Sequence, residues 1–434
     1  MSQTYSPAAR ATRLTRVVLL GTWAVFTLVA LSFVGVFGSN APYADEWEFV
    51  PALLGKEPPL PWLWQQHNEH RMPLPRAIVL AYFKLMHDFR AGMVLQVLMM
   101  SGLALWLVRL ADTLRGAPHW ADAFFPVSLL HVGHWENFLM GYQVCFALVC
   151  VLATAVGVVA LRTTRENAAR SGVVAGVLAW LLCLSNGSGI VVALPVCAWV
   201  AYLAVISRRY ALIALAVAPL FYLAAYFSGY HKPEHHAEPG TGGIEGIVRV
   251  TGQTLAMAFG IGLSAVWPIV WCSMVTVGIW TLRILRGADR PAAVGLVAVV
   301  AGVTGVSVAI GVGRGGMGEH MGIWSRYSFL SWPLLGLMYL AWIRWGTVWG
   351  RRWVPMALCA ASALAFAGNM ITGMAVGMQV ESTLSRVQLE SSGGVPPEDI
   401  VRLFKDTTQA NQEERAVKAI PMLREAKVGG FAGR

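Results

Sequence analysis

The sequence predicts an all-α polytopic membrane protein with about eleven transmembrane helices. Hydrophobic residues make up 56% of the 434-residue chain and charged residues only 13%, and the mean hydropathy is +0.57. So much apolar surface does not fit inside one soluble core. The charged residues also gather in short clusters between long apolar stretches. Both observations favour a chain that crosses a membrane many times.

The apolar stretches define the predicted spans in order. They cover residues 17–37, 91–108, 121–139, 144–161, 172–185, 188–206, 210–227, 261–282, 292–311, 328–343 and 353–374. The fifth and sixth are the least certain pair, because Ser185–Gly189 either breaks one helix or joins two. The first span has a basic flank and no small-residue cleavage site, so it is expected to be retained. Residues 1–374 are thus predicted to form one transmembrane module, and residues 375–434 a short outer tail.

The positions of the arginines predict the orientation. The short loops on one side of an alternating topology hold all the arginine clusters, which are residues 10–16, 109–115, 162–170, 208–209, 283–290 and 344–352. Such loops face the cytoplasm, and the N-terminus lies on their side. The net charge of +10 is therefore ascribed to orientation, and no nucleic-acid partner is expected. The first loop, the later polar loops and the tail fall on the opposite side, where chemistry is expected.

The first outer loop, residues 41–90, is predicted to contain helices that lie along the membrane interface. Between Pro75 and Phe89, apolar residues recur at helical spacing, with charged residues on the opposite side. A helix with this pattern rests its apolar face on membrane lipids. The loop is therefore expected to be a structured layer on the outer surface.

Asp45 and Glu46 follow the first span almost at once. A carboxylate there is half in water and half against the membrane, a setting that raises its pKa or aims it at a lipid-borne substrate. The alternative is that the two acids only mark the water boundary of the helix.

The run Gln65–Arg71, QQHNEHR, offers a hydrogen-bonding side chain at every position and lies between two tryptophans and two prolines. Polar groups beside aromatic rings suit sugar recognition, because rings stack on sugars and hydroxyls need partners. His67, Glu69 and His70 could instead bind a metal, although no fixed fourth ligand is visible. A solvated loop is the third interpretation.

Glu136, Asn137 and Gln143 lie at the next outer turn, between two spans that need no polar residue for insertion. Burying these groups is costly unless they line a cavity. Trp135 and Tyr142 fit ordinary interfacial anchors, but anchoring does not account for the acid and the two amides.

A glycine-rich stretch, Gly311–Gly318, comes shortly before Ser325-Arg326-Tyr327. Its spacing matches GxGxxG, but a dinucleotide fold is rejected because no βαβ unit surrounds it. A flexible outer loop is favoured, whose backbone amides and two arginines, Arg314 and Arg326, hold a phosphate or diphosphate. These arginines run against the positive-inside bias. Ordinary loop charges are the alternative.

Three further features receive structural interpretations. Lys232, within Tyr230–His236, could add to an anion site, but a solvated loop is favoured. Asn186-Gly187-Ser188 matches a glycosylation acceptor, yet it lies at a membrane break. The six cysteines fall in apolar segments without CxxC spacing and are predicted to be small core residues.

Together these strings resemble the GT-C glycosyltransferase fold, whose members take sugar from a polyprenyl-phosphate carrier on the outer side of the membrane. The acidic pair after the first helix and the long first outer loop carry the general likeness. The DEW, QHNEHR, WENxxxGYQ, GRGGMG and SRY strings resemble bacterial membrane proteins labelled as glycosyltransferases of this type. The resemblance implies a bacterial inner membrane location. The tail is shorter than the large outer domain of some members, so acceptor recognition would rest on the loops.

The resemblance also implies roles for individual residues. Asp45 would be the general base, with Glu46 as a neighbour or substitute, and Arg314, Arg326 and the adjacent Tyr327 would bind the carrier phosphate. The sugar and acceptor pocket would be lined by His67, Glu69, His70, Arg71, Glu136, Asn137 and Gln143. The expected partners are a polyprenyl-phosphate-linked sugar, a glycan or lipid acceptor and membrane lipids.

Sugar transfer needs a base near the acceptor hydroxyl and cations near the leaving phosphate, and the outer face offers both. A nucleotide-binding fold is unnecessary, because the donor carries its own leaving group, and none is visible. No cofactor is assigned, although Asp45, Glu46 and Glu136 could share a divalent cation with His67. A transporter or flippase of lipid-linked saccharides is a second class, which broken helices and mid-membrane polar groups would favour. An envelope acyltransferase or ligase is a third.

Overall fold

The computed structural model describes residues 7–233, 238–403 and 413–432. These residues form helices and connecting loops without a β-strand, which confirms the all-α prediction. Eight of the described helices are long and apolar enough to cross a membrane. They are α1 (Pro7–Phe37), α5 (Arg90–Arg115), α8 (Val144–Leu161), α9 (Ala168–Ser185), α10 (Gly187–Ser207), α13 (Trp267–Ile284), α14 (Arg290–Arg314) and α16 (Val348–Ser392). The chain therefore has the composition and architecture of a polytopic helical membrane protein.

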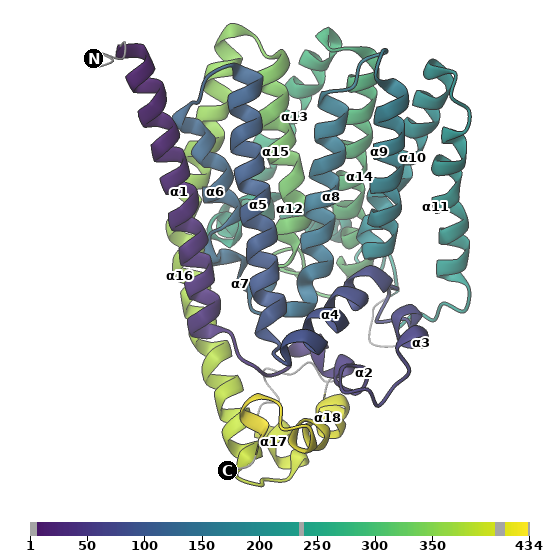
Figure 1. Ribbon diagram of the computed structural model, residues 1–434, viewed down its shortest axis with the longest axis vertical. Helices are drawn as coiled ribbons and strands as arrows, with labels where there is room; N and C mark the ends of the chain where they lie inside the picture. Colours follow the sequence, from purple (N-terminus) through teal and green to yellow (C-terminus); the bar gives the residue numbers. More distant parts are fainter. Residues whose placement is uncertain (1–6, 234–237, 404–412, 433–434) are drawn as a thin grey trace, which may run out of the picture.

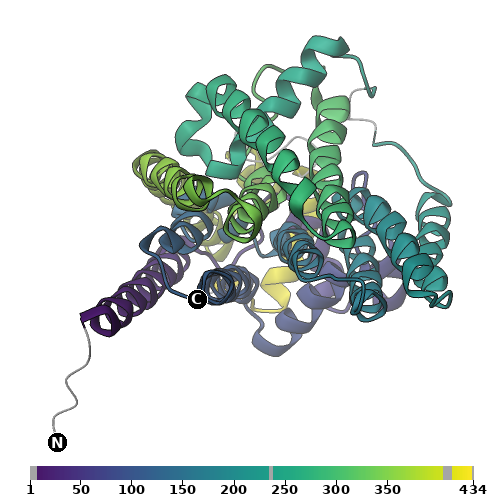
Figure 2. The same cartoon turned by 90° about the horizontal axis from the view of Figure 1, so that it is seen from above.

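The helices stand side by side, with α1 at one edge of the bundle and α11 (Leu212–Phe227) at the opposite edge (Figures 1 and 2). Helix α11 is shorter than the eight, and α15 (Tyr327–Trp345) is buried along almost its whole length. The break at Ser185–Gly189 joins two helices, because α9 ends at Ser185 and α10 begins at Gly187.

The predicted continuous span over 121–139 is wrong, because this segment is interrupted. It forms four short pieces, η2 (Trp120–Ala123), α6 (Phe124–Leu129), η3 (Val132–His134) and α7 (Trp135–Phe138). A second interrupted segment runs from α12 (Gly243–Ala256) through η5 (Met257–Phe259) and η6 (Ile261–Val266) into α13, followed by η7 (Leu285–Gly287).

Asn369, in the middle of α16, joins the two interrupted segments. Its Oδ1 accepts the Gly262 N–H at 2.7 Å, and its Nδ2 donates to the Phe259 carbonyl at 2.9 Å. The same Nδ2 lies 3.3 Å from Nε2 of His131, whose ring stacks on that of His134. An interrupted helix leaves backbone groups unpaired, and inside a membrane protein another polar group must satisfy them. The buried amide does so here.

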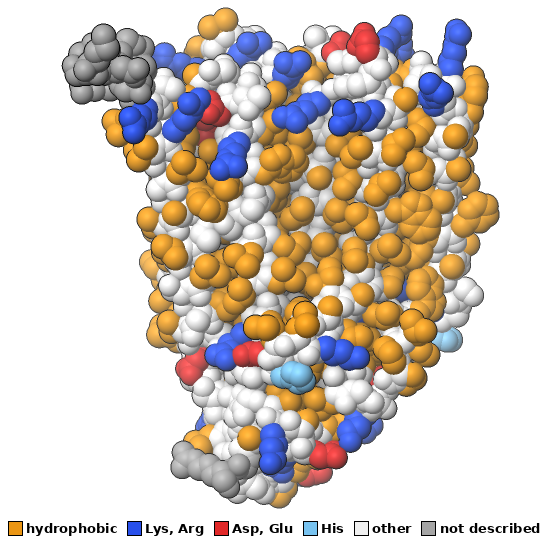
Figure 3. All heavy atoms as spheres, viewed as in Figure 1, with side chains coloured by type: hydrophobic (Ala, Val, Ile, Leu, Met, Phe, Trp, Pro, Cys, Tyr) orange, Lys and Arg blue, Asp and Glu red, His pale blue; other side chains and the backbone are white. Residues whose placement is uncertain are grey.

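The two ends of the bundle differ in charge. Lysines and arginines gather along the end where the N-terminus lies, an apolar band follows, and acids, bases and a histidine appear at the other end (Figure 3). The two termini lie at these opposite ends (Figure 1). A wide apolar belt between two polar ends is the surface expected of a membrane-embedded protein.

The first loop, residues 41–90, folds at the end of the bundle away from the N-terminus. It contains η1 (Ala44–Phe49), α2 (Val50–Leu53), α3 (Pro59–Trp64) and α4 (Pro73–Met86), and α4 lies across the ends of the spans (Figure 1). Helix α4 turns Val79, Tyr82 and Phe83 into the core. The loop is therefore a packed layer.

The C-terminal part folds beneath this layer. Helix α16 is 45 residues long and continues past the bundle, so the polarity change after Gly373 falls within one helix. It leads to α17 (Pro397–Leu403), α18 (Glu413–Glu425) and η9 (Gly429–Phe431). These elements lie under the first loop (Figure 1), where Phe431 meets the Trp47 ring edge-on at 6.4 Å.

Candidate active site

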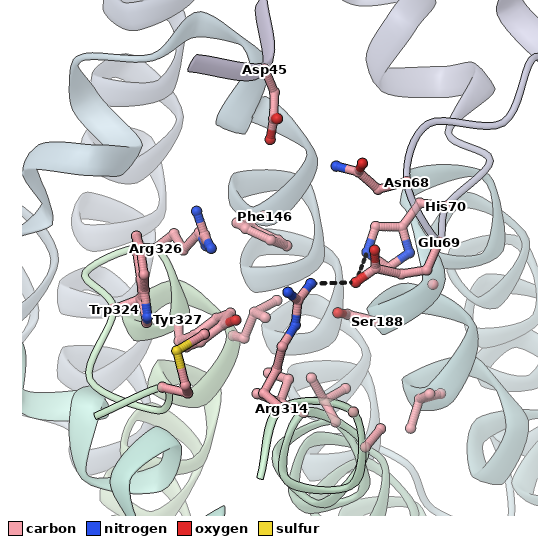
Figure 4. Close-up of a pocket in the computed structure, with 18 of the residues that line it drawn as sticks. Asp45, Asn68, Glu69, His70, Phe146, Ser188, Arg314, Trp324, Arg326 and Tyr327 are labelled. Carbon is pink, nitrogen blue, oxygen red and sulfur yellow. Dashed lines mark hydrogen bonds and ion pairs between the residues drawn. The ribbon is translucent and has the colours of Figure 1, made fainter. Parts of the chain in front are cut away.

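Several helix ends meet around a cavity with both polar and apolar walls, at the end of the bundle that carries the first loop. Its volume is about 390 Å³. The walls come from η1, the 67–70 turn, the start of α8 next to η4 (Gly141–Gln143), the start of α10, the end of α14 and the start of α15. The predicted site residues that line it are Asp45, Glu69, His70, Gln143, Arg314, Arg326 and Tyr327. Most of them appear in Figure 4.

A tight turn aims part of the QHNEHR run into this cavity. The His67 N–H donates to the His70 carbonyl at 2.7 Å, and the His70 N–H donates back at 2.8 Å. Asn68 adopts a positive φ of 47°, a conformation that Asn tolerates better than most residues. Asn68, Glu69 and His70 line the cavity, whereas His67 is buried behind it.

His67 connects two carboxylates of η1. Its Nδ1 lies 2.8 Å from Oε2 of Glu48, and its Nε2 lies 3.7 Å from Oδ2 of Asp45. Glu48 also pairs with Arg76 at 3.3 Å and with Arg415 at 2.8 Å. We call these five residues the carboxylate cluster.

The cluster fixes the charge of its members. Burial favours a neutral Asp45, but the hydrogen bond and charge of His67, together with Arg326 and Arg415, outweigh it and lower the pKa of Asp45 to about 2. Burial also favours a neutral His67, yet Glu48 and Asp45 raise the pKa of His67 to about 9. At neutral pH the cavity therefore faces an ionised carboxylate that has an imidazolium behind it.

Arg326 enters the cavity from the start of α15. Its Nη1 lies 2.7 Å from Oε1 of Glu136, and its backbone N–H donates to Oε2 of Glu136 at 3.1 Å. Its guanidinium lies over the Trp324 ring at 4.4 Å. Burial opposes the charge, but Glu136, Tyr327 and Asp45 outweigh it and raise the pKa of Arg326. Figure 4 shows the Arg326 guanidinium and the Asp45 carboxylate extending into the same space.

Glu136 and Asn137 therefore support the cavity from behind. Glu136 holds Arg326 as described, and the Asn137 side chain donates to the Ser325 carbonyl at 3.3 Å. Both side chains are buried. They fix the backbone that carries Arg326.

Arg314, the last residue of α14, reaches the cavity from the opposite wall. Its Nη2 lies 2.8 Å from Oε1 of Glu69, and the same oxygen lies 3.7 Å from Nε2 of His70 (Figure 4). An anion that enters the cavity therefore meets an arginine that already has a carboxylate partner.

Besides His67, Glu136 and Asn137, two more predicted site residues, Glu46 and Arg71, lie away from the cavity wall. Glu46 is buried and accepts the N–H groups of Tyr43 and Tyr142, both at 3.0 Å; burial outweighs these donors and raises its pKa to about 8. Arg71 donates to the carbonyls of Trp64, Tyr226 and Ser228 at 2.8–2.9 Å. Glu46 thus holds the start of η1, and Arg71 ties the first loop to the end of α11.

The start of α10 is a cavity wall that sequence reasoning missed. Gly187 and Ser188 line the cavity, and the Asn186 side chain caps the helix by accepting the Gly189 N–H at 2.9 Å. A Cβ at Gly187 would come within 2.7 Å of Nδ1 of His70. The signal was present, because an Asn before an apolar run is a helix start, and helix N-termini attract anions.

Lys232 also lines the cavity, although it pairs with Glu238. Of its predicted cluster, Tyr230–His236, the last three residues, Glu234–His236, lie outside the described residues. Tyr142, Phe146, Tyr230 and Trp324 add aromatic rings to the wall beside that of Tyr327, and apolar side chains, mainly of α14, line much of the rest.

Within the described residues, no group of three or more His, Cys, Asp or Glu side chains could hold a metal ion. Asp45, Glu46, Glu136 and His67, suggested as ligands of a divalent cation, do not form such a group. Glu46 accepts backbone N–H groups and Glu136 pairs with Arg326 instead. Of the cysteines, four are buried as predicted, whereas Cys359 is half-buried and Cys272 is exposed on the apolar surface of α13.

The comparisons with known proteins add no family to this geometry. No protein family model matches the chain, and neither a curated protein nor a solved structure matches it.

Proposed function

We propose that the protein is a membrane glycosyltransferase that moves a sugar from a polyprenyl-phosphate carrier to a hydroxyl of a cell-envelope glycan or lipid. The site would face the outer side of a bacterial inner membrane, with the N-terminus in the cytoplasm and the C-terminal tail outside. One observation carries this proposal: an ionised carboxylate and two arginines line one cavity of about 390 Å³ at the end of the bundle that carries the first loop. That volume lies within the usual range for small-ligand sites.

Asp45 would act on the acceptor. As the acceptor oxygen forms a bond to the anomeric carbon, the bond from that carbon to the carrier phosphate breaks and its electron pair leaves with the phosphate. The hydroxyl proton passes to Asp45. His67 lies behind Asp45 and would keep it ionised and oriented.

Arg326 and Arg314 would hold the carrier phosphate, with the start of α10 as a third source of positive potential. Developing negative charge on a leaving phosphate is stabilised most by donors fixed in advance. Arg326 fits this role, because Glu136 and the Trp324 ring fix its guanidinium. Arg314 would exchange Glu69 for the phosphate. Glu69 and His70, freed on one side, would meet sugar hydroxyls.

A transporter of lipid-linked saccharides is the second candidate, and one observation favours it. Two interrupted segments meet at Asn369 and His131 inside the bundle, and interrupted helices with buried polar groups are frequent in transporters. The cavity favours sugar transfer over transport, because a transporter does not need a carboxylate opposite fixed arginines.

One assay separates the two. The full chain in proteoliposomes is given polyprenyl-phosphate hexoses and pentoses that carry radiolabelled sugar, with an extract of envelope lipids and glycans as acceptor. We expect label to move to the acceptor while polyprenyl phosphate is released. Label that crosses the bilayer but stays on its carrier would establish the transporter, and transfer from acyl-labelled lipid alone would point to an acyltransferase.

A further inference from the structure

The C-terminal tail contacts the back of the helix that carries Asp45. Helix α18 turns Ala416, Ala419, Ile420 and Leu423 inward and packs against η1 and α2. The tail thus closes the side of η1 that faces away from the cavity.

Arg415, in the first turn of α18, reaches the carboxylate cluster from that side. Its Nη1 lies 2.8 Å from Oε2 of Glu48, whose side chain is only 14% exposed. Oε2 of Glu48 is also the atom that faces Nδ1 of His67 at 2.8 Å. One oxygen of a partly buried carboxylate therefore connects a residue of the tail with the histidine behind Asp45.

We propose that Arg415 is a positioning residue for Asp45, acting through Glu48 and His67. This inference rests on the proposed sugar transfer. Glu48 without Arg415 would be shared by His67 and Arg76 alone, and the His67 ring would turn or shift to compensate. A misplacement of about 1 Å at a base costs on the order of 100-fold in rate.

Arg415 is not needed to dock the tail. Lys56 pairs with Glu425 at 3.1 Å, Gln388 Nε2 donates to the Asn40 carbonyl at 2.9 Å, and Phe431 packs on Trp47. The ion pair with Glu48 is therefore an addition to a tail that other contacts hold in place, which makes its removal a usable test.

The sequence separates Arg415 from Glu48 by more than 360 positions. The charged and titratable groups near His67 come from several elements. They are Asp45 and Glu48 of η1, His70 of the turn, Arg76 of α4, Tyr142 of η4, Arg326 beside α15, and Arg415 of α18. Arg415 is the contribution of the tail to this set, and it lowers the pKa of both Asp45 and Glu48.

The test compares Arg415→Met and Arg415→Lys with Lys418→Met, a change at an exposed position of the same helix. Each full-length variant is assayed with the polyprenyl-phosphate sugar that the wild type transfers. We expect Arg415→Met to lower kcat about 10- to 100-fold at an unchanged KM. The acid limb of the pH–rate profile should move toward higher pH, because Arg415 lowers the pKa of Asp45. Arg415→Lys should restore part of kcat, and Lys418→Met should match the wild type.

A second measurement needs no substrate. Thermal unfolding of Arg415→Met, Glu48→Gln and the double variant forms a cycle that reports the pair itself. Losses in melting temperature that are not additive support the pair, whereas additive losses overturn the inference. An unchanged kcat and pH profile in Arg415→Met, with an active wild type, also overturns it. A wild type that transfers no sugar removes the proposed function, and the cycle still decides whether Arg415 belongs to the cluster.

Discussion

Two polar clusters of this protein satisfy their polar groups in opposite ways. The carboxylate cluster of Asp45, Glu48, His67, Arg76 and Arg415 balances charge with charge and opens on a cavity. The amide cluster, which we define as Asn369, His131 and His134, lies inside the bundle and pairs its amide with backbone groups of an interrupted helix.

The difference indicates that the first cluster serves the reaction and the second stabilises the fold. A charged cluster beside a cavity keeps one carboxylate ionised and available, as catalysis requires. A neutral cluster that other residues enclose has its amide engaged with backbone groups, so its main effect is on the fold. The variants that follow sharpen this contrast, because they separate effects on the fold from effects at the cavity.

Replacing the amide should have the largest effect on stability. Asn369→Leu leaves the Gly262 N–H and the Phe259 carbonyl without a partner inside the bundle, at about 1 to 3 kcal/mol for each group. Thermal unfolding in detergent should show a loss of about 2 to 6 kcal/mol in the free energy of unfolding. Met378→Leu, at an exposed position of the same helix, is the control. A melting temperature equal to that of the wild type would show that the amide does not support the interruption.

Replacing the buried histidine should change the pH dependence of stability. The pKa of His67 is raised from 6.5 to about 9, so its ion pairs stabilise the fold fully below pH 6.5 and lose this effect as pH rises through about 9. The pKa of Asp45 is lowered from 3.8 to about 2, so its contribution is present above pH 3.8 and lost toward pH 2. The stability difference between the wild type and His67→Gln should therefore be constant from about pH 4 to 6.5 and narrow toward pH 9.

Unfolding midpoints of both proteins, measured at matched pH values, provide this difference. The pH dependence contributed by groups that both proteins share, such as Glu46, cancels in it. A difference that stays constant across pH 6.5 to 9 would mean that His67 is not held as an imidazolium.

The cavity ion pair should give the smallest effect. Arg314→Met removes a phosphate partner and should raise the KM for the polyprenyl-phosphate sugar about tenfold, because a hydrogen bond to a charged group contributes about 1.5 to 3 kcal/mol. Glu69→Gln weakens the ion pair that competes with the phosphate for Arg314. It should lower KM, or leave KM unchanged if Glu69 also binds the sugar. Steady-state kinetics of both variants test the exchange, and equal rises in KM would contradict it.

The sequence predicted the cavity better than the bundle around it. Asp45, Glu69 and Arg314 could be found because charged groups beside apolar spans are costly and stand out. Their partners could not be assigned, since Glu136 and Arg326 are almost 200 positions apart and only the fold brings them together.

Most of the features that could not be predicted lie within apolar stretches of the sequence. Asn369 is one amide within an apolar stretch, and hydropathy alone gave no sign that 121–139 is interrupted. Gly187 and Ser188 were interpreted as a break between spans, although the same residues start α10 at the cavity. Arg415 belongs to a polar tail that has no local signal for its contact with Glu48.

The central claim is that Asp45 is the base of a sugar transfer. The most direct test compares Asp45→Asn with Asp88→Asn, which changes a partly exposed aspartate of the same loop that pairs with Arg90. Release of polyprenyl phosphate from the labelled sugar donor is followed in proteoliposomes. We predict that Asp45→Asn lowers kcat by at least about 100-fold, that it still unfolds cooperatively but at a lower melting temperature because its ion pair with His67 is lost, and that Asp88→Asn is fully active. Full activity of Asp45→Asn would contradict the account.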